Sequence, residues 1–574
     1  MSSKTRFALA GLCGVLLWSS AAPAVDIFVV GGQGQSWQEA AGSAPVIDFA
    51  SQPGWILPSS IGEVTNVARE TYERGGRVTS PNAQTVLRLG KEAMEARLRS
   101  MVDGDHQTAF EAKNVAATGI LLVIDLGARF GVDQIRFFPR PDYHTDFMKG
   151  YVLSVNDGAF GADIVAASPD KLPNKSLFTI IAQDGSNNSD TVDVRFPLQY
   201  VRYIRLESTQ RFNWEVDELE IFGEGFVPQA QYLSRVFDFE QPSLWGRLKW
   251  AAQQQGNPAK SRIFIRTRSG NAPDPVADPQ AWSSWSPPFR FSGEQIPSPS
   301  PRRYLQFSVD FESDGLGDGV AIDSLALEYS RPALATAIAG EIWPQEVAVG
   351  RDTTFTYAVQ VTSARGFDRL EIDTPAPVTQ VRSMRLDGQD RAFTLEEFAA
   401  GLALSFARVT GSHTLEVDFD TAVLRYETVF TGRLRDTQTA SLPQNVESGE
   451  ASADLPGGDL SVRVPLRGGV VHQVEVAPNP FSPNDDGVND LATITFDLSH
   501  LTEEVPASLV VLDLAGRPVA QLPVASVHSG RQHLAWDGQD AGGDRVPPGL
   551  YLVQLEVETD SGTKRGHRVL AVVY

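Results

Sequence analysis

Cysteine is nearly absent from this sequence. The only one among 574 residues is Cys13, which lies in an apolar segment close to the N-terminus. No disulfide and no cysteine nucleophile can therefore form in the chain beyond that segment. A lipid anchor on Cys13 is the alternative, but Leu12 stands where lipoprotein signals carry a small residue. The domains must be stabilised by apolar cores, with or without a bound metal ion.

Long apolar runs are absent too. No stretch reaches the roughly 20 residues of a membrane helix. The longest run near the N-terminus, residues 7–18, follows Lys4 and Arg6 and precedes Ala22-Pro23-Ala24. This order is typical of a cleaved signal peptide, so we expect residues 1–24 to direct the export of a bacterial protein. The chain would then be extracellular, surface-associated or periplasmic.

Basic residues are outnumbered by acidic ones. The sequence has 49 Lys and Arg against 71 Asp and Glu, which gives a net charge of −22. Such a surface repels phosphate backbones and anionic lipids, so nucleic acid is a poor partner for this protein. The same charge also keeps a secreted protein in solution and need have no other role.

Motifs for catalysis are missing as well. The eight histidines are scattered, and no pair has the spacing with a central Glu that helical zinc sites need. The sequence has no Gly-x-Ser-x-Gly elbow and no phosphate-binding Gly-rich loop ahead of a helix. A glycosidase needs only two suitably placed carboxylates, so a hydrolase stays open as an alternative. We expect no enzyme.

Most structured stretches alternate polar and apolar residues, or are rich in β-branched and aromatic residues, with Gly, Pro, Asn or Asp between them. This pattern predicts antiparallel sheets. Helical periodicity is present only over residues 83–102, where Gly90 weakens it. We therefore expect an all-β, multidomain string of antiparallel β-sandwiches, a jelly roll followed by immunoglobulin-like sandwiches.

Four domains are expected, because single cores stop growing at about 250 residues. Breaks at Val227-Pro228 and at Pro332 separate them. Residues 25–65 have scattered apolar residues among Gly, Ser and Pro, and we expect an irregular lead-in strand or linker there. The expected domains are a jelly roll at 66–226, a β-sandwich of unknown role at 227–332, an immunoglobulin-like sandwich at 333–470 and a C-terminal immunoglobulin-like domain at 471–574.

Tryptophan is concentrated in the second domain, at Trp245, Trp250, Trp282 and Trp285. Such residues can form a platform on which sugars stack. Packing in a core or against a neighbouring domain is the commoner use of tryptophan, and both readings stay open.

Five motifs in the first domain follow one another in a telling order and spacing. They lie at residues 101–110, 124–127, 135–138, 203–206 and 218–223. With these motifs the domain resembles the discoidin, or coagulation-factor type C, family of galactose-binding-like jelly rolls. The resemblance implies binding of glycans, lipid head groups or protein surfaces, and some members are non-catalytic modules of sugar-degrading enzymes.

The discoidin resemblance also implies a structural calcium site. In the family, the loop that carries an Asp-Gly-Asp element often holds calcium, together with a hydroxyl and a late acidic residue. Calcium takes six to eight oxygen ligands, which clustered carboxylates and backbone carbonyls can supply. The matching residues are Asp103, Asp105, Thr108 and Glu218. The alternative is a turn in which Asp and Thr cap a strand end without metal.

Ligands in the discoidin family are usually bound by loops at one end of the sandwich. The matching loops, residues 140–147 and 210–214, combine aromatic rings with hydrogen-bonding groups, a mixture that suits sugars. The alternative is that both loops pack against a neighbouring domain. The candidate ligand-binding residues are Arg140, Tyr143, His144, Phe212, Asn213 and Trp214.

Three landmarks mark the C-terminal hundred residues. They are residues 479–490, residues 511–519, and Trp536-Asp537-Gly538 followed by residues 546–551. The domain resembles the immunoglobulin-like domain of flagellar hook-capping proteins, which also occurs at the C-terminus of secreted bacterial proteins. The resemblance implies a role in sorting or anchoring by partner machinery, or an inert spacer.

The acidic loop of this domain has oxygen side chains around Gly487, as a calcium loop does. It lacks the distant bidentate Glu and the flanking helices of an EF-hand. A calcium site or a metal-free loop closed by Asx turns are the two alternatives. The candidate ligands are Asp485, Asp486, Asn489 and Asp490.

Together these features predict an exported, non-catalytic protein that recognises a glycan or another extracellular surface ligand through its jelly roll. Its C-terminal domain would mediate sorting, anchoring or assembly. A structural surface-assembly protein without a small ligand is one alternative, and a secreted polysaccharide hydrolase or its accessory subunit is the second.

Overall fold

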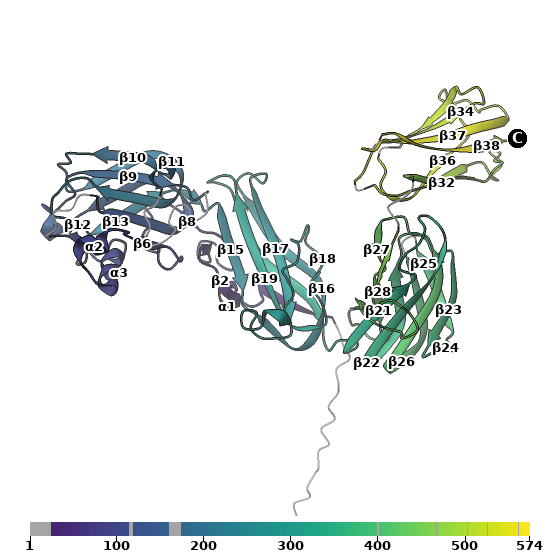
Figure 1. The fold of residues 1–574 in the computed structure, drawn as a ribbon, viewed down its shortest axis with the longest axis horizontal. Coiled ribbons are helices and arrows are strands. Elements are labelled where there is room, and N and C mark those ends of the chain that lie inside the picture. Colours follow the sequence, from purple (N-terminus) through teal and green to yellow (C-terminus); the bar gives the residue numbers. More distant parts are fainter. Residues whose placement is uncertain are drawn as a thin grey trace, which may run out of the picture. The chain divides into compact units, whose positions relative to one another are not determined.

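The computed structural model describes residues 25–62, 64–113, 119–159, 174–398, 401–464, 469–501, 503–524, 526–560 and 562–574. The expected signal peptide at 1–24, with Cys13, lies outside these ranges. The described chain forms two compact units, Asp26–Tyr329 and Ser330–Tyr574. Nearly all of its strands pair antiparallel, so the all-β prediction is confirmed (Figure 1).

The jelly roll lies in the first unit and is built on a six-stranded sheet in the order β10-β9-β11-β8-β13, with β6 beside β8. Strands β7 and β12 form a separate two-stranded sheet. The strands are β6 (Arg77–Thr79), β7 (Phe110–Ala112), β8 (Leu121–Phe138), β9 (Tyr151–Asn156), β10 (Thr179–Asp184), β11 (Val192–Ser208), β12 (Trp214–Val216) and β13 (Glu218–Gly223).

Two of these strands are longer than the sequence suggested. The sequence pattern predicts short strands at 121–127, 134–140, 191–197 and 200–208, and each of β8 and β11 replaces two of them. Their mutual pairing shifts register between Arg195 and Gln199, on either side of Pro197. Proline cannot donate to the ladder, and here it falls at a bulge that bends the strand without ending it. Because proline is typical of turns, the sequence predicts a strand boundary at Pro197 where the structure has a bulge.

The expected helical segment is present in two pieces, α2 (Ala83–Leu87) and α3 (Lys91–Arg99). Arg88 adopts a left-handed conformation with φ 56°, which ends α2, and Gly90 is the N-cap of α3. Met94 and Leu98 of α3 are buried. Both helices lie against one side of the jelly roll (Figure 1).

The second sandwich contains the N-terminal segment of the chain. Its eight-stranded arrangement runs β1-β20-β16-β19-β15-β2, with β17 beside β19 and β18 beside β16. The main elements are β1 (Val25–Gly31), α1 (Trp37–Ala40), β2 (Ala41–Ser43), β15 (Gln229–Ser234), β16 (Phe237–Gln255), β17 (Ser261–Gly270), β18 (Glu294–Gln295), β19 (Arg302–Ser313) and β20 (Gly319–Ser330). The short strands β3 (Ile47–Asp48), β4 (Leu57–Pro58), β5 (Ser60–Ile61) and β14 (Gly225–Phe226) connect it to the jelly roll.

The segment 25–65, expected to be an irregular lead-in strand or linker, is in part regular and contributes β1, α1 and β2 to the second sandwich. Trp37 is buried against the rings of Tyr232 and Phe307, with ring centroids 5.2 and 6.3 Å away. Its Nε1 donates a hydrogen bond to the carbonyl of Asp323 at 2.9 Å. These short stretches form strands because β1 pairs with β20 and β2 with β15, both far along the chain, and a local pattern does not identify such partners.

The tryptophans of the second sandwich serve packing. Trp245 and Trp282 are buried, and their Nε1 atoms donate to the backbone carbonyls of Pro299 and Ala272. The Arg268 guanidinium lies 5.3 Å from the ring of Trp282 and 4.6 Å from that of Trp285. A sugar-stacking platform would need open ring faces, so the packing alternative is favoured.

The second unit contains the other two sandwiches. The first is dominated by β22 and β26, which pair along most of their length. Its strands are β21 (Ala337–Trp343), β22 (Thr353–Asp373), β23 (Gln380–Leu386), β24 (Gln389–Asp390), β25 (Phe393–Phe398), β26 (Gly401–Thr421), β27 (Glu427–Val429), β28 (Gly432–Arg435), β29 (Gln444–Asn445), β30 (Glu447–Ser448) and β31 (Ser461–Arg463).

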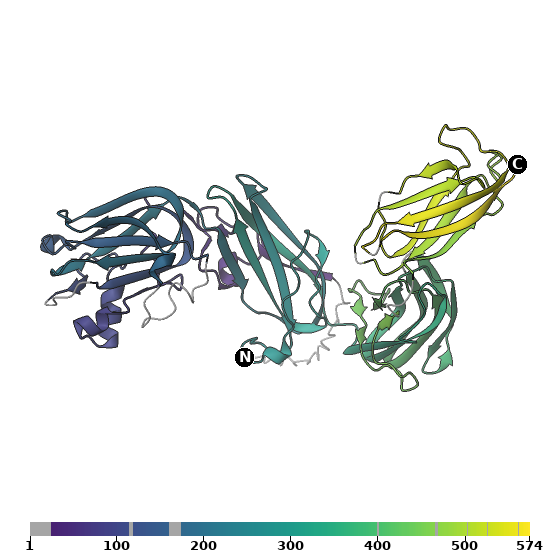
Figure 2. The ribbon, with the colours of Figure 1, turned by 45° about the horizontal axis from the view of Figure 1, so that its top comes forward.

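The C-terminal domain packs a three-stranded sheet, β32-β33-β36, against a four-stranded sheet, β35-β34-β37-β38, drawn in yellow in Figure 2. Its core includes Phe481 and Trp536, whose ring centroids lie 5.4 Å apart. The strands are β32 (Val471–Ala477), β33 (Ala492–Leu498), β34 (Ala507–Leu512), β35 (Pro518–Leu522), β36 (Gly530–Trp536), β37 (Gly549–Val557) and β38 (Lys564–Val572). Within the part of the chain that the structure describes, no helix has the length and apolar character needed to span a bilayer.

Substitution of the N-terminal segment tests its place in the second sandwich. Trp37→Ala should lower the free energy of unfolding of the 26–329 unit by about 3–5 kcal/mol, because it removes a buried ring and a hydrogen bond. Ile27→Ala is the matched control in the same segment, since Ile27 is exposed. Calorimetry of both full-length variants should show a lowered transition for the first only. Equal transitions would mean that the segment contributes nothing to the core.

Candidate ligand-binding loops

Two loops meet at one end of the jelly roll. The first follows β8 and the second joins β11 to β12. Backbone hydrogen bonds hold them together: Glu215 N donates to Asp146 O at 2.8 Å, and Thr209 N donates to Gly150 O at 2.9 Å. The sequence prediction that these loops lie together is consistent with these two hydrogen bonds, which join segments far apart in the chain.

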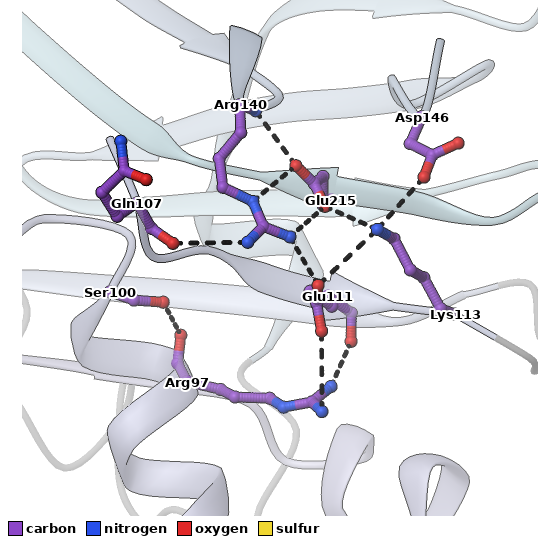
Figure 3. A network of polar contacts seen from close by, with 8 residues as sticks. All are labelled: Arg97, Ser100, Gln107, Glu111, Lys113, Arg140, Asp146 and Glu215. Carbon is purple, nitrogen blue, oxygen red and sulfur yellow. Dashed lines mark hydrogen bonds and ion pairs between the residues drawn. The ribbon is translucent and has the colours of Figure 1, made fainter. Parts of the chain in front are cut away.

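Glu215, on β12, is the centre of the polar network between the loops (Figure 3). Its carboxylate is buried and accepts hydrogen bonds from Arg140 N and Nε, both at 3.0 Å, and from Arg140 Nη2 at 2.8 Å. Lys113 Nζ lies 2.9 Å from the same carboxylate. Arg140 and Lys113 also contact Glu111, at 2.5 and 3.6 Å, and Lys113 reaches Asp146 at 3.2 Å.

The network shifts the ionisation of its members. Burial alone would raise the pKa of Glu215, but the hydrogen bonds from Arg140 and Lys113 outweigh it and hold that pKa below its usual value. Hydrogen bonding to Glu215 in turn raises the pKa of Arg140. The pKa of Lys113 is also raised, because its hydrogen bonds to Glu215 and Asp146 exceed the opposing effect of burial. All three groups therefore stay charged across the physiological range.

Tyr143 stands over this network. Its ring centroid lies 4.0 Å from Lys113 Nζ and 4.4 Å from the guanidinium carbon of Arg140. Cations placed over an aromatic face are attracted to it and restrict its orientation. The residue nevertheless keeps 44% of its surface exposed. Tyr143 is thus a positioned ring that a ligand can reach.

The second loop separates into exposed and buried residues. Phe212 is 54% exposed, and His144 and Asn213 are also at the surface. Trp214, by contrast, is only 1% exposed and stacks on Phe110 with the ring centroids 5.6 Å apart. The expectation that Trp214 contacts a ligand is therefore wrong, because both ring faces lie inside the protein. Trp214 is a core residue that packs against Phe110 beneath the loops.

The candidate calcium residues are brought together at the loop before β7. Thr108 Oγ1 lies 2.9 Å from Asp103 Oδ2 and 3.1 Å from the carbonyl oxygen of Asp105. Glu218 approaches the same turn, where its Oε1 accepts a hydrogen bond from Gly104 N at 2.5 Å. The sequence predicts one site from these four residues although Glu218 follows Asp103 by 115 positions. The fold brings all four to one turn.

Glu218 is buried, and its Oε2 has no hydrogen-bond partner among the described residues. Burial raises the pKa of this carboxyl to about 7, and the nearby charge of Asp103 adds to the effect. Beside it, buried Asp217 contacts His106 Nδ1 at 2.8 Å. An unpartnered buried carboxylate oxygen is costly unless a proton or a cation neutralises it.

The described residues contain no group of three or more His, Cys, Asp or Glu side chains placed to hold a metal ion. A cation at Glu218 would therefore need hydroxyl and backbone carbonyl oxygens beside the carboxylates. Neighbouring oxygens about 3 Å apart are what Ca²⁺ with bonds of about 2.3–2.6 Å requires. The Asp103, Asp105 and Thr108 oxygens have that spacing, but the Thr108 hydroxyl donates hydrogen bonds to the other two. These contacts also suit the metal-free turn, so both alternatives of the sequence analysis stay open.

The acidic loop of the C-terminal domain is organised differently. The Asp490 carboxylate accepts hydrogen bonds from the backbone nitrogens of Asn484, Asp485 and Gly487 at 2.7–3.0 Å. Asp486 likewise accepts from Val488 N, and Asp485 pairs with Arg545. Asn489 has a left-handed backbone, with φ 59°. These contacts satisfy the oxygens of Asp490 internally, which favours the metal-free loop closed by Asx turns.

Sequence reasoning missed the residues that hold the loop end together. Glu215, Glu111 and Lys113 belong to none of the motifs or loops, and Asp146 lies in the 140–147 loop but is not among the candidate residues. One signal was available: Glu215 alternates with the apolar Trp214 and Val216 in a short strand. Alternation places Glu215 on the outer face of the strand, where an acidic side chain is ordinarily solvated. In the structure the loop that carries Arg140 covers this carboxylate and buries it.

Comparison with known proteins identifies the C-terminal domain. Residues 484–561 match the family model of the FlgD Ig-like domain. The resemblance noted in the sequence is thus confirmed for this domain. No curated protein matches the chain.

Several solved structures resemble part of the chain. Chitosan-binding module 1 from a chitosanase/glucanase of Paenibacillus sp. IK-5 is 15% identical, with a TM-score of 0.20, and the match covers 28% of this chain and 99% of that one. CpGH89CBM32-5 from Clostridium perfringens, in complex with GalNAc-β-1,3-galactose, is 17% identical with a TM-score of 0.19, covering 26% and 97%. The family 32 module of C. perfringens NanJ, in complex with galactose, is 18% identical with a TM-score of 0.18, covering 26% and 91%. Identities and TM-scores this low say nothing of a ligand for this chain, so support for one must come from its own residues.

Neutralising Glu215 tests the network. Glu215→Gln should destabilise the 26–329 unit by about 3 kcal/mol near neutral pH, since it leaves Arg140 and Lys113 without their buried counter-charge. Because the pKa of Glu215 is lowered in the folded protein, its contribution is present above the unfolded-state pKa and is lost as the pH falls through the folded one. The difference between wild type and variant should therefore shrink in acid.

Urea unfolding between about pH 3 and pH 7 measures this difference. Asp146→Asn is the matched control, since Asp146 is partly exposed and pairs only with Lys113. It should cost less than about 1 kcal/mol. A pH-independent loss in Glu215→Gln would contradict an electrostatic role.

Proposed function

We propose that this protein is an exported, non-catalytic binding protein that takes a glycan at the loop end of its jelly roll. The observation that carries the proposal is the pair of exposed rings, Tyr143 and Phe212, on two loops that are hydrogen-bonded to each other. Aromatic rings stack on the C–H faces of sugars, and charged planar groups pair with hydroxyls. Both kinds of group are present here at one surface.

Binding would be passive, and its specificity would come from the loops. Glu215, Arg140 and Lys113 fix the first loop before any ligand arrives, so little further ordering is needed on binding. The exposed His144 and Asn213 supply donors and acceptors beside the rings. Since every charged group in the network already has a partner, an uncharged polyhydroxylated ligand suits this surface better than an ionic one.

Calcium is part of the proposal. The ion would be held by Asp103, Thr108, the carbonyl of Asp105 and Glu218, and it would neutralise the buried carboxylate. The support is the buried Oε2 of Glu218, which has no partner among the described residues, together with the approach of Glu218 to the turn that carries Asp103, Asp105 and Thr108. Asp103 and Thr108 lie directly before β7, which pairs with β12, so an ordered turn here would stiffen the strand next to Glu215.

The C-terminal domain would serve sorting, anchoring or assembly. Its own apolar core is separate from that of the preceding sandwich, so it can act as an independent module. A purely structural role in surface assembly is the second candidate, favoured by the packing role of the tryptophans in the second sandwich.

Glycan arrays test the binding proposal. The full-length chain should bind at least one class of array glycan, and Tyr143→Ala or Phe212→Ala should weaken that binding by about tenfold, or ~1.4 kcal/mol. Tyr426→Ala and Phe291→Ala are matched controls, because both residues are exposed rings elsewhere in the chain. Loop variants that bind as tightly as the wild type would rule out this site, and a chain without any array signal would exclude glycan as the ligand.

Calcium dependence gives a second test. Without metal, the pKa of Glu218 is raised in the folded protein, so a proton on Glu218 stabilises the folded state. This stabilisation is present in acid and is lost as the pH rises through about 7. Calcium should therefore raise the melting temperature of the 26–329 unit at about pH 8 much more than at about pH 5.5.

The response should disappear in Glu218→Gln and persist in Asp486→Asn, which alters the C-terminal acidic loop. Differential scanning calorimetry in EDTA and in calcium measures both variants. A calcium shift of equal size in Glu218→Gln would place the ion elsewhere.

A further inference from the structure

A groove of about 730 Å³ lies between the jelly roll and the second sandwich, within the 26–329 unit. This volume is in the range of small-molecule and oligosaccharide sites, about 300–1,000 Å³. One wall comes from the jelly roll, with Arg129, Arg202 and Gly158, and the other from the outer face of β15, β19 and β17. Figures 1 and 2 both show the β8 end of the jelly roll beside β15.

The walls of the groove are fixed relative to each other. Phe226 N donates to Leu316 O at 2.7 Å, and Ile56 exchanges backbone hydrogen bonds with Ile322. Gly131 of β8 lies so close to Leu316 that a Cβ atom there would meet Leu316 Cδ2 at 2.4 Å. A single apolar core includes residues of both sandwiches. The groove is therefore a preformed feature of one compact unit.

The sheet wall presents planar polar groups in a row. Gln229 lies opposite Glu312, and Gln231 lies opposite Asp310, which in turn faces Phe264. Gln231 Nε2 donates to Asp310 Oδ1 at 2.6 Å. Gln229 makes no side-chain hydrogen bond to any described residue, so its amide is available to a ligand. Phe264 supplies the one aromatic ring of this row.

Each of the three arginines of the groove is paired with a carboxylate. Arg202 makes a bidentate pair with Asp125 at 3.0 and 3.4 Å, and Arg129 Nη2 lies 3.3 Å from Asp157. Arg266 pairs with Asp310. The three side chains nevertheless remain 26–33% exposed. Their guanidinium groups are thus held in place at the groove surface.

This composition points to a particular ligand chemistry. A guanidinium–carboxylate pair and an amide–carboxylate pair each offer a donor and an acceptor in one plane, which matches two neighbouring hydroxyls. An anionic ligand is disfavoured, because Asp310 and Glu312 line the same groove and every arginine already has a carboxylate. A nucleotide is disfavoured for the same reason.

We propose that this groove is a second ligand site, which binds a segment of a neutral oligosaccharide along the face of β15, β19 and β17. It is separate from the loop end, since Arg129 and Phe138 are nine residues apart on β8, or roughly 30 Å of extended strand. The inference shares with the proposed function only the class of ligand. It adds a site in which two domains of the chain cooperate.

Titration calorimetry of the full-length chain with hexasaccharides of glucan, mannan, xylan and galactan tests the groove. The double variant Gln231→Ala/Phe264→Ala should lose at least tenfold in affinity for the hexasaccharide that binds best. Gln231 is exposed and Phe264 half-buried, so folding should be retained, which calorimetric melting checks. Lys249→Ala, exposed on the same sandwich, is the control and should bind like the wild type.

Hydrogen exchange with the bound hexasaccharide locates the site independently. Protection over residues 229–231 and 264–266 is the expected result. Protection confined to 140–147 and 210–213, with Tyr143→Ala alone weakening binding, would overturn the groove and leave the loop proposal standing. The reverse pattern would support the groove and remove the loop site. If no neutral hexasaccharide binds, or if an oligogalacturonate binds instead, the groove proposal fails.

Discussion

Burial of apolar sheet faces is the constraint on which this structure depends. With its single cysteine at position 13, the described chain has no covalent crosslink to substitute for a core. Each sheet must therefore find a second layer. In the first unit this requirement recruits the N-terminal segment, whose Trp37 fills the space between Tyr232 and Phe307. Other contacts, such as the close approach of Gly131 to Leu316, fix the two sandwiches of the unit against each other and form the groove between them.

Buried charge plays a second, local role at the loop end. Glu215 would be unfavourable inside the protein by itself, yet it organises Arg140 and Lys113 from two different segments. Those cations then orient the ring of Tyr143. A rigid, mostly internal network thus presents a few exposed rings and polar groups. Glu218 differs, since its Oε2 has no partner in the part of the chain that the structure describes, and this difference separates the proposed metal site from the ligand loops.

Several features could be predicted from local sequence. The sequence pattern predicts strands at 151–157 and 218–223, and the structure has them at Tyr151–Asn156 and Glu218–Gly223, because β-branched and aromatic residues between turn residues report a strand directly. The spacing of the C-terminal motifs likewise led to the FlgD Ig-like domain. The site was predictable only in part. Tyr143 and Phe212 are exposed as expected, while Trp214 is in the core, and sequence alone does not tell an exposed tryptophan from a buried one.

What the sequence determined by itself was the all-β class, the order of its strands and the absence of crosslinks, since periodicity, turn residues and composition are local properties. The tertiary structure alone decided that residues 25–43 belong to a sandwich whose other strands lie far later in the chain, from Gln229 onwards. It also decided that Glu215 is buried and that Gln231, Phe264 and Arg202 line one groove. These outcomes depend on contacts between segments far apart in the chain, and no pattern within a short window encodes which distant partner will cover a given side chain.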